Sequence, residues 1–314
     1  MGRAFVFPGQ GSQAVGMGKA LNDAFTTARY FFEEVDEALG QHLSQLMFEG
    51  PEEQLRLTEN AQPAIMAASL ATLRVLEAEA NLVLPEQARF VAGHSLGEYT
   101  ALTAAGSLGV PDAARLVKLR GRAMQDAVPI GEGAMAALLG LDFAAVKALA
   151  EEASDGDEVC CPANDNAPGQ VVVSGSKDAV QRVLDLAREK GAKRALMLAV
   201  SAPFHCPLMA PAAACMEEAL AGIELAPPSV PLVANVTAEA VSEPEDIRRL
   251  LVEQVTGLVR WRESVKYLRN QGIDTLIELG AGKVLSGLTR RIDGDMTALN
   301  AGTPEEVEAL LAAL

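Results

Sequence analysis

The stretch that decides the fold is Arg89-Phe90-Val91-Ala92-Gly93-His94-Ser95-Leu96-Gly97. Its first four residues are a short apolar run that predicts a buried strand, and residues 96–105 have the apolar spacing of a helix. The turn between them matches Gly-x-Ser-x-Gly, which in a strand–turn–helix setting is the pattern of a nucleophile elbow. Glycine at both ends of the turn lets the strand and the helix approach closely. The stretch therefore predicts an α/β fold in which Ser95 is exposed above the end of a sheet strand.

Short apolar runs alternate with amphipathic stretches on both sides of this turn. The predicted strands are 3–7, 89–92, 230–235, 273–279 and 296–300, and the predicted helices are 20–39, 62–80, 96–105, 111–125, 205–221, 244–256, 260–271 and 304–313. Strands that alternate with helices indicate a parallel sheet covered on both faces. We therefore predict a large α/β-hydrolase-like domain with a parallel sheet core, formed by residues 1–126 and 202–314.

A second pattern begins near residue 127. It has strands at 134–139, 170–174 and 194–200, helices at 142–153 and 177–190, and a polar loop rich in proline and asparagine at 154–169. Strand, helix, strand, helix, strand within about 70 residues is typical of a ferredoxin-like unit. We predict that residues 127–201 form a small ferredoxin-like α+β domain inserted into the larger one.

Composition excludes several classes of protein. The chain has 314 residues, 49% of them apolar, which is enough for a large core. Its formal charge of −16 disfavours nucleic acid and anionic membranes as partners. The four cysteines lack the spacing of zinc ligands, and the N-terminus lacks the pattern of a secretory signal. We predict a soluble cytoplasmic protein that needs no metal or cofactor.

A nucleophilic serine needs a base, and the chain offers three histidines. His205 is favoured because it lies in a loop after a predicted strand, whereas His94 is fixed beside the serine and His42 suits the surface. An α/β-hydrolase places its histidine late, after an acid, but no histidine occurs among the more than one hundred residues after His205. A standard hydrolase triad therefore fits badly, and a serine esterase or thioesterase of related architecture is only an alternative.

Two glycine-rich stretches suggest phosphate binding. Gly9-Gln10-Gly11-Ser12-Gln13-Ala14 fits G-x-G-x-x-[G/A] after a strand, and acidic residues follow about twenty positions later, including Glu33 and Glu34. A dinucleotide-binding oxidoreductase is thus a second alternative, although it leaves the serine turn unexplained. Gly280-Ala281-Gly282-Lys283 is followed by Val284 where a phosphate loop requires serine or threonine, so that motif fails.

Five segments together resemble the malonyl-CoA:acyl carrier protein transacylase family over essentially the whole chain. They are Phe7-Pro8-Gly9-Gln10-Gly11-Ser12-Gln13, Gly93-His94-Ser95-Leu96-Gly97-Glu98-Tyr99, Arg120-Gly121-Arg122-Ala123-Met124-Gln125, Pro203-Phe204-His205, and Glu278-Leu279-Gly280-Ala281-Gly282-Lys283-Val284-Leu285. The resemblance implies transfer of a malonyl group from malonyl-CoA to the phosphopantetheine thiol of holo acyl carrier protein, in a ping-pong reaction.

The resemblance also implies the catalytic groups. Ser95 would carry the acyl group, and His205 would take the serine proton and later activate the incoming thiol. Gln254 matches the position whose backbone carbonyl orients the histidine in place of an aspartate. A carbonyl in that place fixes the imidazole tautomer without adding a buried negative charge that would repel the malonyl carboxylate.

Three further residues are implied to bind the substrate. Gln10 would line the site, and the backbone N–H groups of Gln10 and Leu96 would form the oxyanion hole. Arg120 would pair with the malonyl carboxylate, because a guanidinium matches both carboxylate oxygens. A neutral acetyl group would then leave Arg120 buried without a partner, which predicts a preference for malonyl.

The implied partner protein requires a local basic patch, because acyl carrier proteins are acidic and this chain is acidic too. The candidates for docking are Arg188, Lys190, Lys193 and Arg194, and later in the chain Lys283, Arg290 and Arg291. We expect the protein to act as a monomer, with no nucleic-acid partner and no membrane association.

Overall fold

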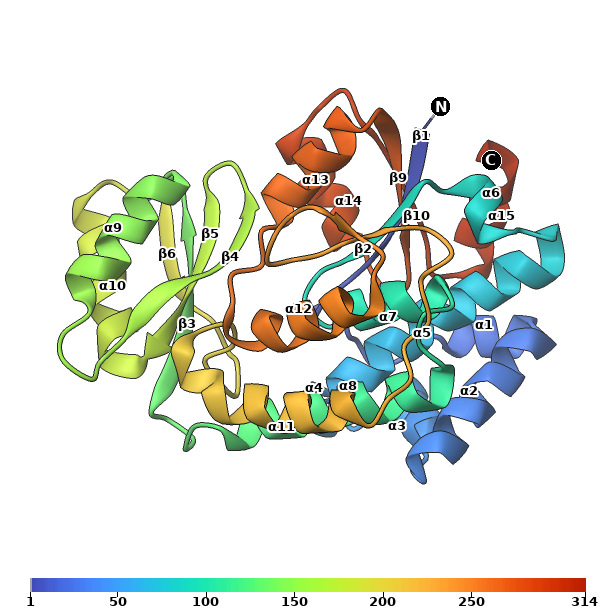
Figure 1. The fold of residues 1–314 in the computed structure, drawn as a ribbon, viewed down its shortest axis with the longest axis horizontal. Helices are drawn as coiled ribbons and strands as arrows, with labels where there is room; N and C mark the ends of the chain where they lie inside the picture. The colour runs from blue at the N-terminus through green and yellow to red at the C-terminus, as the bar shows by residue number, and fades with distance from the viewer. Residues whose placement is uncertain (1) are drawn as a thin grey trace.

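Residues 2–314, which the computed structural model describes, form two β-sheets surrounded by helices (Figure 1). The large sheet has the strand order β10-β9-β1-β2-β7-β8, and its neighbours pair in parallel except for β7 and β8. Its strands are β1 (Gly2–Phe7), β2 (Phe90–Gly93), β7 (Leu232–Val233), β8 (Ala240–Val241), β9 (Ile273–Leu279) and β10 (Thr297–Ala301). The chain is therefore a mixed α/β protein with a largely parallel sheet at its centre.

Both faces of the large sheet are buried, as the apolar runs predict. Along β1, Phe5 and Phe7 join the core cluster shared with the N-terminal helices, whereas Ala4 and Val6 join a separate cluster on the opposite face with Trp261. The helices of this part are α1 (Lys19–Ala24), α2 (Thr26–Leu39), α3 (Leu43–Glu49), α4 (Glu52–Arg56), α5 (Thr58–Ala80), α6 (Leu84–Gln87), α7 (Gly97–Ala104), α8 (Val110–Asp126), α11 (Ala210–Ala221), α12 (Pro244–Thr256), α13 (Trp261–Asn270), α14 (Val284–Ile292) and α15 (Pro304–Ala313).

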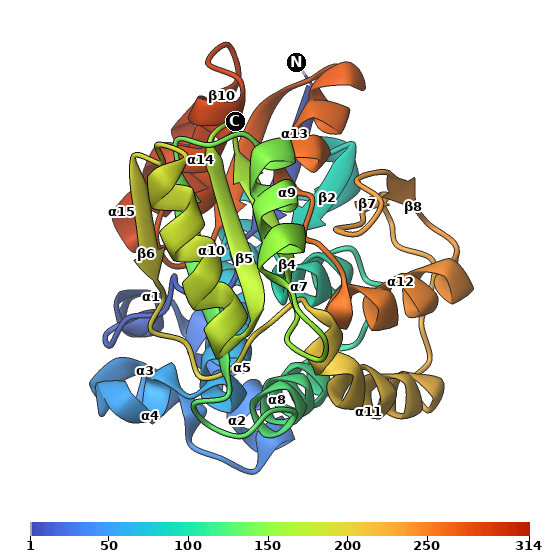
Figure 2. The ribbon, with the colours of Figure 1, turned by 90° about the vertical axis from the view of Figure 1, so that its left-hand side faces the viewer.

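The small sheet lies to one side of the large one and is antiparallel. Its order is β4-β5-β3-β6, formed by β3 (Gly133–Leu139), β4 (Cys160–Ala167), β5 (Gln170–Ser176) and β6 (Arg194–Met197). Helices α9 (Phe143–Ala153) and α10 (Lys177–Glu189) cover one face of the sheet, as Figure 2 shows, and bury their own apolar cluster against it. The opposite face is turned toward the large sheet.

The predicted loop at 154–169 is wrong for residues 160–167, which form β4. The sequence Cys-Cys-Pro-Ala-Asn-Asp-Asn-Ala has little strand propensity, so local preference favours a loop. β4 is an edge strand with two register shifts against β5, and such a strand tolerates Pro162. Its outer edge is held by Val259, whose N–H donates to Ala163 at 2.9 Å and whose carbonyl accepts from Asp165 at 3.0 Å. Tertiary contacts therefore make this segment a strand.

Other element boundaries differ from the predictions. The predicted helix 20–39 is broken at Phe25, whose backbone is extended. The predicted strands 194–200 and 230–235 are shorter, and the predicted helix 205–221 begins with a 3-10 turn at Pro207–Met209 before α11. Helices α3, α4, α6 and α14 and strand β8 were not predicted. Within residues 2–314, no helix combines the length and the hydropathy that crossing a membrane requires.

Candidate active site

Ser95 occupies the turn between β2 and α7, with φ at 55°. A Cβ added to Gly93 would overlap the carbonyl group of Gly97, and one added to Gly97 would overlap the carbonyl oxygen of Phe7. Both glycines are therefore required by close backbone approach. The left-handed conformation of a serine is costly, and it places the side chain above the end of the sheet.

His205 reaches Ser95 from the segment between β6 and α11. Its Nε2 lies 2.7 Å from Ser95 Oγ, and its Nδ1 lies 2.9 Å from the backbone carbonyl oxygen of Gln254. Because that carbonyl can only accept, Nδ1 carries the proton and Nε2 is free to accept the serine proton. His205 is buried and also has a left-handed backbone, with φ at 58°. The structure thus brings together the serine, the histidine and the carbonyl named from the sequence.

The electrostatics keep the His205 imidazole neutral. Burial, followed by the positive charge of Arg120, lowers the pKa of His205 to about 3. The ring is therefore neutral across the neutral range, and its Nε2 can accept a proton.

Arg120 lies on α8 and is 1% exposed. Its Nη2 donates to Ser95 Oγ at 3.2 Å and to Gln254 Oε1 at 2.8 Å, and its Nη1 donates to Gln62 Oε1 at 2.9 Å. All of these partners are neutral, and Arg120 forms no ion pair with a carboxylate of residues 2–314. Its Nε has no hydrogen-bond partner there either. A buried cation without an anion is a site for an anionic group of a substrate.

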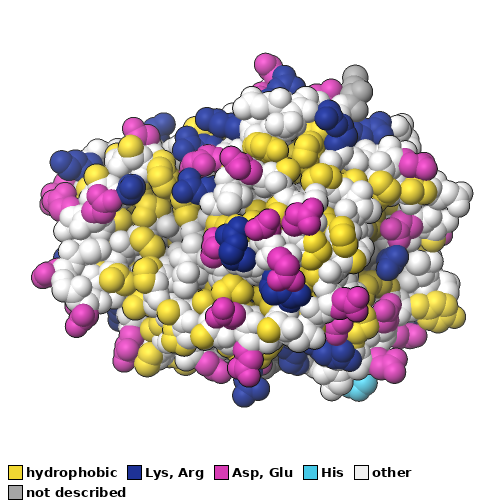
Figure 3. Space-filling model, viewed as in Figure 1, with side chains coloured by type: hydrophobic (Ala, Val, Ile, Leu, Met, Phe, Trp, Pro, Cys, Tyr) yellow, Lys and Arg dark blue, Asp and Glu magenta, His cyan; other side chains and the backbone are white. Residues whose placement is uncertain are grey.

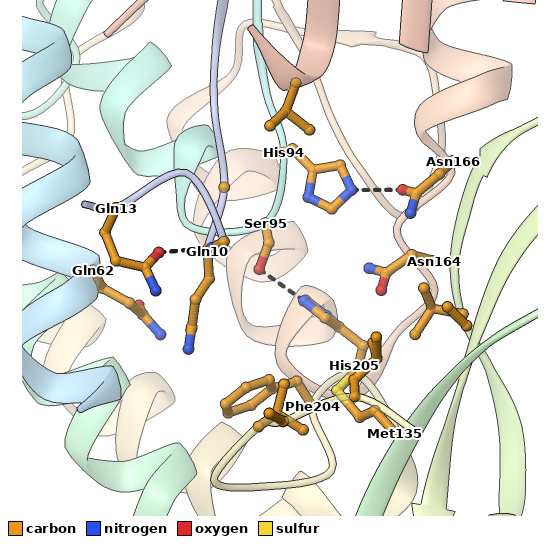
Figure 4. A pocket seen from close by; sticks show the side chains of 18 of the residues that line it. Gln10, Gln13, Gln62, His94, Ser95, Met135, Asn164, Asn166, Phe204 and His205 are labelled. Carbon is orange, nitrogen blue, oxygen red and sulfur yellow. Dashed lines mark hydrogen bonds between the residues drawn. The ribbon is translucent and has the colours of Figure 1, made fainter. Parts of the chain in front are cut away.

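A cavity of about 560 Å³ contains these groups and lies between the two sheets (Figure 4). The large-sheet side contributes Gln10, Gln62, His94, Ser95, Arg120, Phe204 and His205, and the small-sheet side contributes Met135, Ala137, Asn164, Asn166 and Val172. Leu96 is buried in the turn beneath the cavity. Neither the backbone N–H of Gln10 nor that of Leu96 donates a hydrogen bond to another atom of the described chain.

Comparison with known proteins assigns the chain to a family. Residues 4–291 match the family described as acyl transferase domain. The malonyl CoA-acyl carrier protein transacylase of Bacillus subtilis (strain 168) is 44% identical over 311 residues, which cover 99% of this chain and 96% of the relative. The transacylase of Escherichia coli (strain K12) is 46% identical over 308 residues, 98% of each chain. The chain belongs to the malonyl CoA-acyl carrier protein transacylase family.

Solved structures of the transacylase family share the fold. The acyl-carrier-protein-S-malonyltransferase of Bartonella henselae aligns with a TM-score of 0.97 at 54% identity, covering 100% of this chain and 99% of that one. A structure of a type II PKS acyl-carrier protein in complex with its malonyl-transacylase aligns with a TM-score of 0.96 at 43% identity, covering 100% of both chains. The mixed α/β architecture with two sheets is therefore that of known transacylases.

In this member of the transacylase family, sequence reasoning missed the side-chain network that holds the serine turn. Asn235 Oδ1 accepts from the Ser95 N–H at 2.7 Å, and Asn235 Nδ2 donates to the Gly93 carbonyl at 2.6 Å. Gln254 Nε2 donates to the Ser95 carbonyl at 2.9 Å and to Glu98 Oε2 at 2.7 Å. Both backbone polar groups of the strained serine are thus fixed by side chains, which maintains its left-handed conformation.

A second missed contact crosses from one sheet to the other. His94 Nε2 lies 2.8 Å from Asn166 Oδ1 of β4 (Figure 4), and the His94 ring lies 5.8 Å from that of Trp261. Asparagines in a predicted loop carry no signal of this role. His94 therefore connects the serine turn to the small sheet and does not reach the serine as a base.

The features that suggested a dinucleotide site do not assemble. The loop after β1 runs through residues 8–18 before α1 begins, whereas a dinucleotide fingerprint opens directly into a helix. Glu33 and Glu34 are exposed on α2, and Lys283 pairs with Glu306 at 2.8 Å.

His42 is exposed at the start of α3. No cluster of residues that could hold a metal ion occurs within residues 2–314.

The burial of the Glu98 carboxyl makes the free energy of unfolding depend on pH, and this dependence can be measured. Burial raises the pKa of the carboxyl from 4.5 to about 7, despite hydrogen bonds from Gln254 and Asn235 and the charge of Arg120, which lower it. Between pH 4.5 and about 7, the folded protein therefore keeps a proton on Glu98 that the unfolded chain has released. Protonated Glu98 contributes fully to the free energy of unfolding below pH 4.5, and this contribution is lost as the pH rises through about 7. The loss amounts to about 3 kcal/mol.

We expect Glu98→Gln to lack this loss. The difference in free energy of unfolding between variant and wild type, from urea titrations, should shift in favour of the variant as the pH rises from 5 to 8. A difference that stays constant with pH would contradict the assignment.

Proposed function

We propose that the chain transfers a malonyl group from malonyl-CoA to the thiol of holo acyl carrier protein through a malonyl ester on Ser95. The observation that carries the proposal is the Ser95–His205 pair, 2.7 Å apart, in a cavity that also holds Arg120 without a carboxylate partner in residues 2–314. Such a site combines an activated nucleophile with a receptor for one negative charge. The names of the relatives support the same substrate and acceptor.

In the first half-reaction, Ser95 Oγ attacks the thioester carbonyl carbon while its proton moves to His205 Nε2. The oxyanion is received by the free N–H groups of Gln10 and Leu96. The tetrahedral intermediate then breaks its carbon–sulfur bond, and the departing CoA thiolate takes the proton from the imidazolium. The product is a malonyl ester of Ser95 with His205 again neutral.

In the second half-reaction, the phosphopantetheine thiol gives its proton to His205 Nε2 and its sulfur attacks the ester carbonyl. Collapse returns the proton to Ser95 Oγ and releases malonyl-acyl carrier protein. The carbonyl of Gln254 at His205 Nδ1 stabilises the imidazolium that forms in both halves. A neutral carbonyl does this without placing a second negative charge near the malonyl carboxylate.

Arg120 links substrate choice to the base. The malonyl carboxylate neutralises the guanidinium, and the charge of Arg120 is one cause of the low pKa of His205. Binding of malonyl therefore raises the basicity of His205, whereas an acetyl group does not. Contrary to the expectation from the sequence, an acetyl group does not leave the guanidinium without hydrogen-bond partners, because Gln62 and Gln254 already accept from it. Selectivity rests on the positive charge of Arg120, which no carboxylate of residues 2–314 contacts directly, and not on missing hydrogen bonds.

A serine hydrolase is the alternative with the same nucleophile, and product analysis separates the two. Malonyl-CoA is incubated with the enzyme and holo acyl carrier protein, and malonyl-acyl carrier protein and free malonate are quantified. The proposal expects nearly all of the malonyl group on the carrier protein. Predominant release of malonate would establish a hydrolase instead.

We also propose the division into domains expected from the sequence: an α/β-hydrolase-like domain of residues 1–126 and 202–314, and an inserted ferredoxin-like domain of residues 127–201. The order β3-α9-β4-β5-α10-β6 and the antiparallel order of the small sheet support the second assignment. Action as a monomer in the cytoplasm stays a prediction.

Docking of the carrier protein is proposed at the exposed end of the small sheet. On the face shown in Figure 3, basic and acidic side chains are interspersed. Among the candidates, Arg188 pairs with Asp185 and Lys283 with Glu306, and the side chains of Arg290 and Arg291 donate to Ala298 and Gln170. Lys190, Lys193 and Arg194 are exposed and form no ion pair within residues 2–314, and of these Lys193 and Arg194 are adjacent at the start of β6. These two are the best candidates to receive an acidic partner.

Charge reversal tests this surface. We expect Lys193→Glu with Arg194→Glu to raise the KM for holo acyl carrier protein about tenfold, since two opposed charge pairs are lost, with formation of the malonyl-enzyme unchanged. Arg29→Glu, on the exposed side of α2, is the control and should change neither the KM for holo acyl carrier protein nor the formation of the malonyl-enzyme. An unaltered KM in the double variant would exclude this patch.

A further inference from the structure

Arg120 and Glu98 are both buried, at 1% exposure each, and are connected through one side-chain amide. Arg120 Nη2 donates to Gln254 Oε1 at 2.8 Å, and Gln254 Nε2 donates to Glu98 Oε2 at 2.7 Å. Glu98 Oε2 also accepts from the Asn235 N–H at 3.1 Å. The two charged side chains are thus bridged by Gln254 and do not contact each other directly.

The chemistry of the partners fixes the orientation of the Gln254 amide. A guanidinium can only donate, so it must face Oε1. The carboxylate of Glu98 and the carbonyl of Ser95 can only accept, so both must face Nε2. Turning the amide over would place donor against donor and acceptor against acceptor. Glu98 and the Ser95 carbonyl together therefore hold Gln254 with Oε1 facing Arg120.

We propose that Glu98 is a positioning residue that supplies the counter-charge of Arg120 through the Gln254 amide and so leaves the guanidinium able to receive a carboxylate. The inference rests on the proposed malonyl transfer. Three N–H donors of Arg120 are used within the described chain, by Gln62, Gln254 and Ser95, out of the five that a guanidinium carries. A carboxylate in direct contact would occupy the remaining donors.

The arrangement couples substrate binding to a proton. The malonyl carboxylate brings a second negative charge to Arg120, so a pocket that is neutral with Glu98 ionised becomes anionic unless Glu98 is protonated. The groups facing Glu98 are Arg120 from α8, Tyr99 from its own helix, Gln254 from α12 and Asn235 after β7. Glu98 has a pKa of about 7, whereas the pKa of His205 is about 3, so Glu98 is the group that titrates near neutral pH.

The test measures binding of malonyl-CoA to the Ser95→Ala enzyme by calorimetry between pH 6.5 and 8.5. We expect the dissociation constant to rise about fivefold from pH 7 to pH 8, the limit for one linked proton on a group whose pKa in the free enzyme is about 7. Introducing Glu98→Gln into the Ser95→Ala enzyme keeps the acceptor oxygen but removes the charge, and should abolish the rise of the dissociation constant with pH. Acetyl-CoA carries the same phosphates without the carboxylate, and its dissociation constant corrects for their titration. Glu79→Gln, exposed at the end of α5, is the matched control and should keep the rise.

Two outcomes would overturn the inference. If Glu98→Gln weakens the binding of malonyl-CoA equally at every pH, the rise of the dissociation constant with pH is retained. Glu98 would then have a merely structural role. Should that variant fail to fold, proton uptake by Ser95→Ala alone decides: calorimetry in buffers of different ionisation enthalpy should show about half a proton taken up at pH 7, and none would refute the coupling. A wild-type enzyme that forms no malonyl ester would refute the proposed function itself, whereas ester formation with either outcome above refutes only the inference.

Discussion

Ser95→Ala is expected to abolish acyl transfer. The variant removes the oxygen that attacks the thioester and that lies 2.7 Å from His205 Nε2. Loss of a nucleophilic serine lowers kcat by on the order of 10⁵-fold or more, because the rest of the site can only assist direct attack. The measurement is the rate of malonyl transfer to holo acyl carrier protein, together with circular dichroism to show that the fold is retained.

Cys206→Ser is the control for this result. Cys206 adjoins the base, and its thiol is buried with a raised pKa, which makes it a poor nucleophile. Serine preserves the hydrogen bond that Sγ makes to the Pro203 carbonyl at 3.0 Å. We expect transfer by this variant to stay within a few-fold of wild type. Transfer that survives in Ser95→Ala but fails in Cys206→Ser would reassign the nucleophile.

Arg120→Ala is expected to reverse the preference for the acyl group. Loss of the buried cation should lower kcat/KM for malonyl-CoA by on the order of a hundredfold, which corresponds to about 3 kcal/mol for a charge-assisted pair. Transfer of acetyl should hold or rise, because the charge that lowers the pKa of His205 is removed. Parallel assays with malonyl-CoA and acetyl-CoA give the ratio directly.

Arg122→Ala is the matched control on the same helix. Its side chain is 71% exposed and pairs with Asp126 at 3.7 Å, so its loss should change neither rate. Arg120→Lys keeps the charge without the planar fork and should lie between alanine and wild type. An equal fall in malonyl and acetyl transfer by Arg120→Ala would show that the residue supports the fold and not the choice of substrate.

The serine turn could be predicted from the sequence because its requirements are local. A strand, a tight turn and a helix follow one another within a few residues, and the two glycines are dictated by contacts within the turn and with β1. His205 could be named as the base from its place in a loop after a predicted strand, but that strand, β6, belongs to the antiparallel small sheet, so its approach to Ser95 depends on how the two sheets pack together. The roles of Arg120 and Gln254 came from resemblance alone, because the role of each residue depends on contacts with a partner far along the chain.

The groups that sequence reasoning missed are fixed by tertiary contacts. Glu98 directly follows the turn glycine and has the local pattern of an exposed helix residue, yet it is buried beneath Asn235 and Gln254. Asn166 belongs to a strand whose residues favour a loop and which is held by contacts at both of its edges. No spacing rule within one segment reports such pairings, because the partners lie 19 to 156 positions apart.

Mass analysis of the enzyme quenched after brief exposure to malonyl-CoA tests the central claim most directly. Digestion and peptide mapping should locate a malonyl group on Ser95, and addition of holo acyl carrier protein before the quench should remove it. A malonyl group found on another residue, or an enzyme that transfers malonyl without ever carrying it on Ser95, would contradict the account.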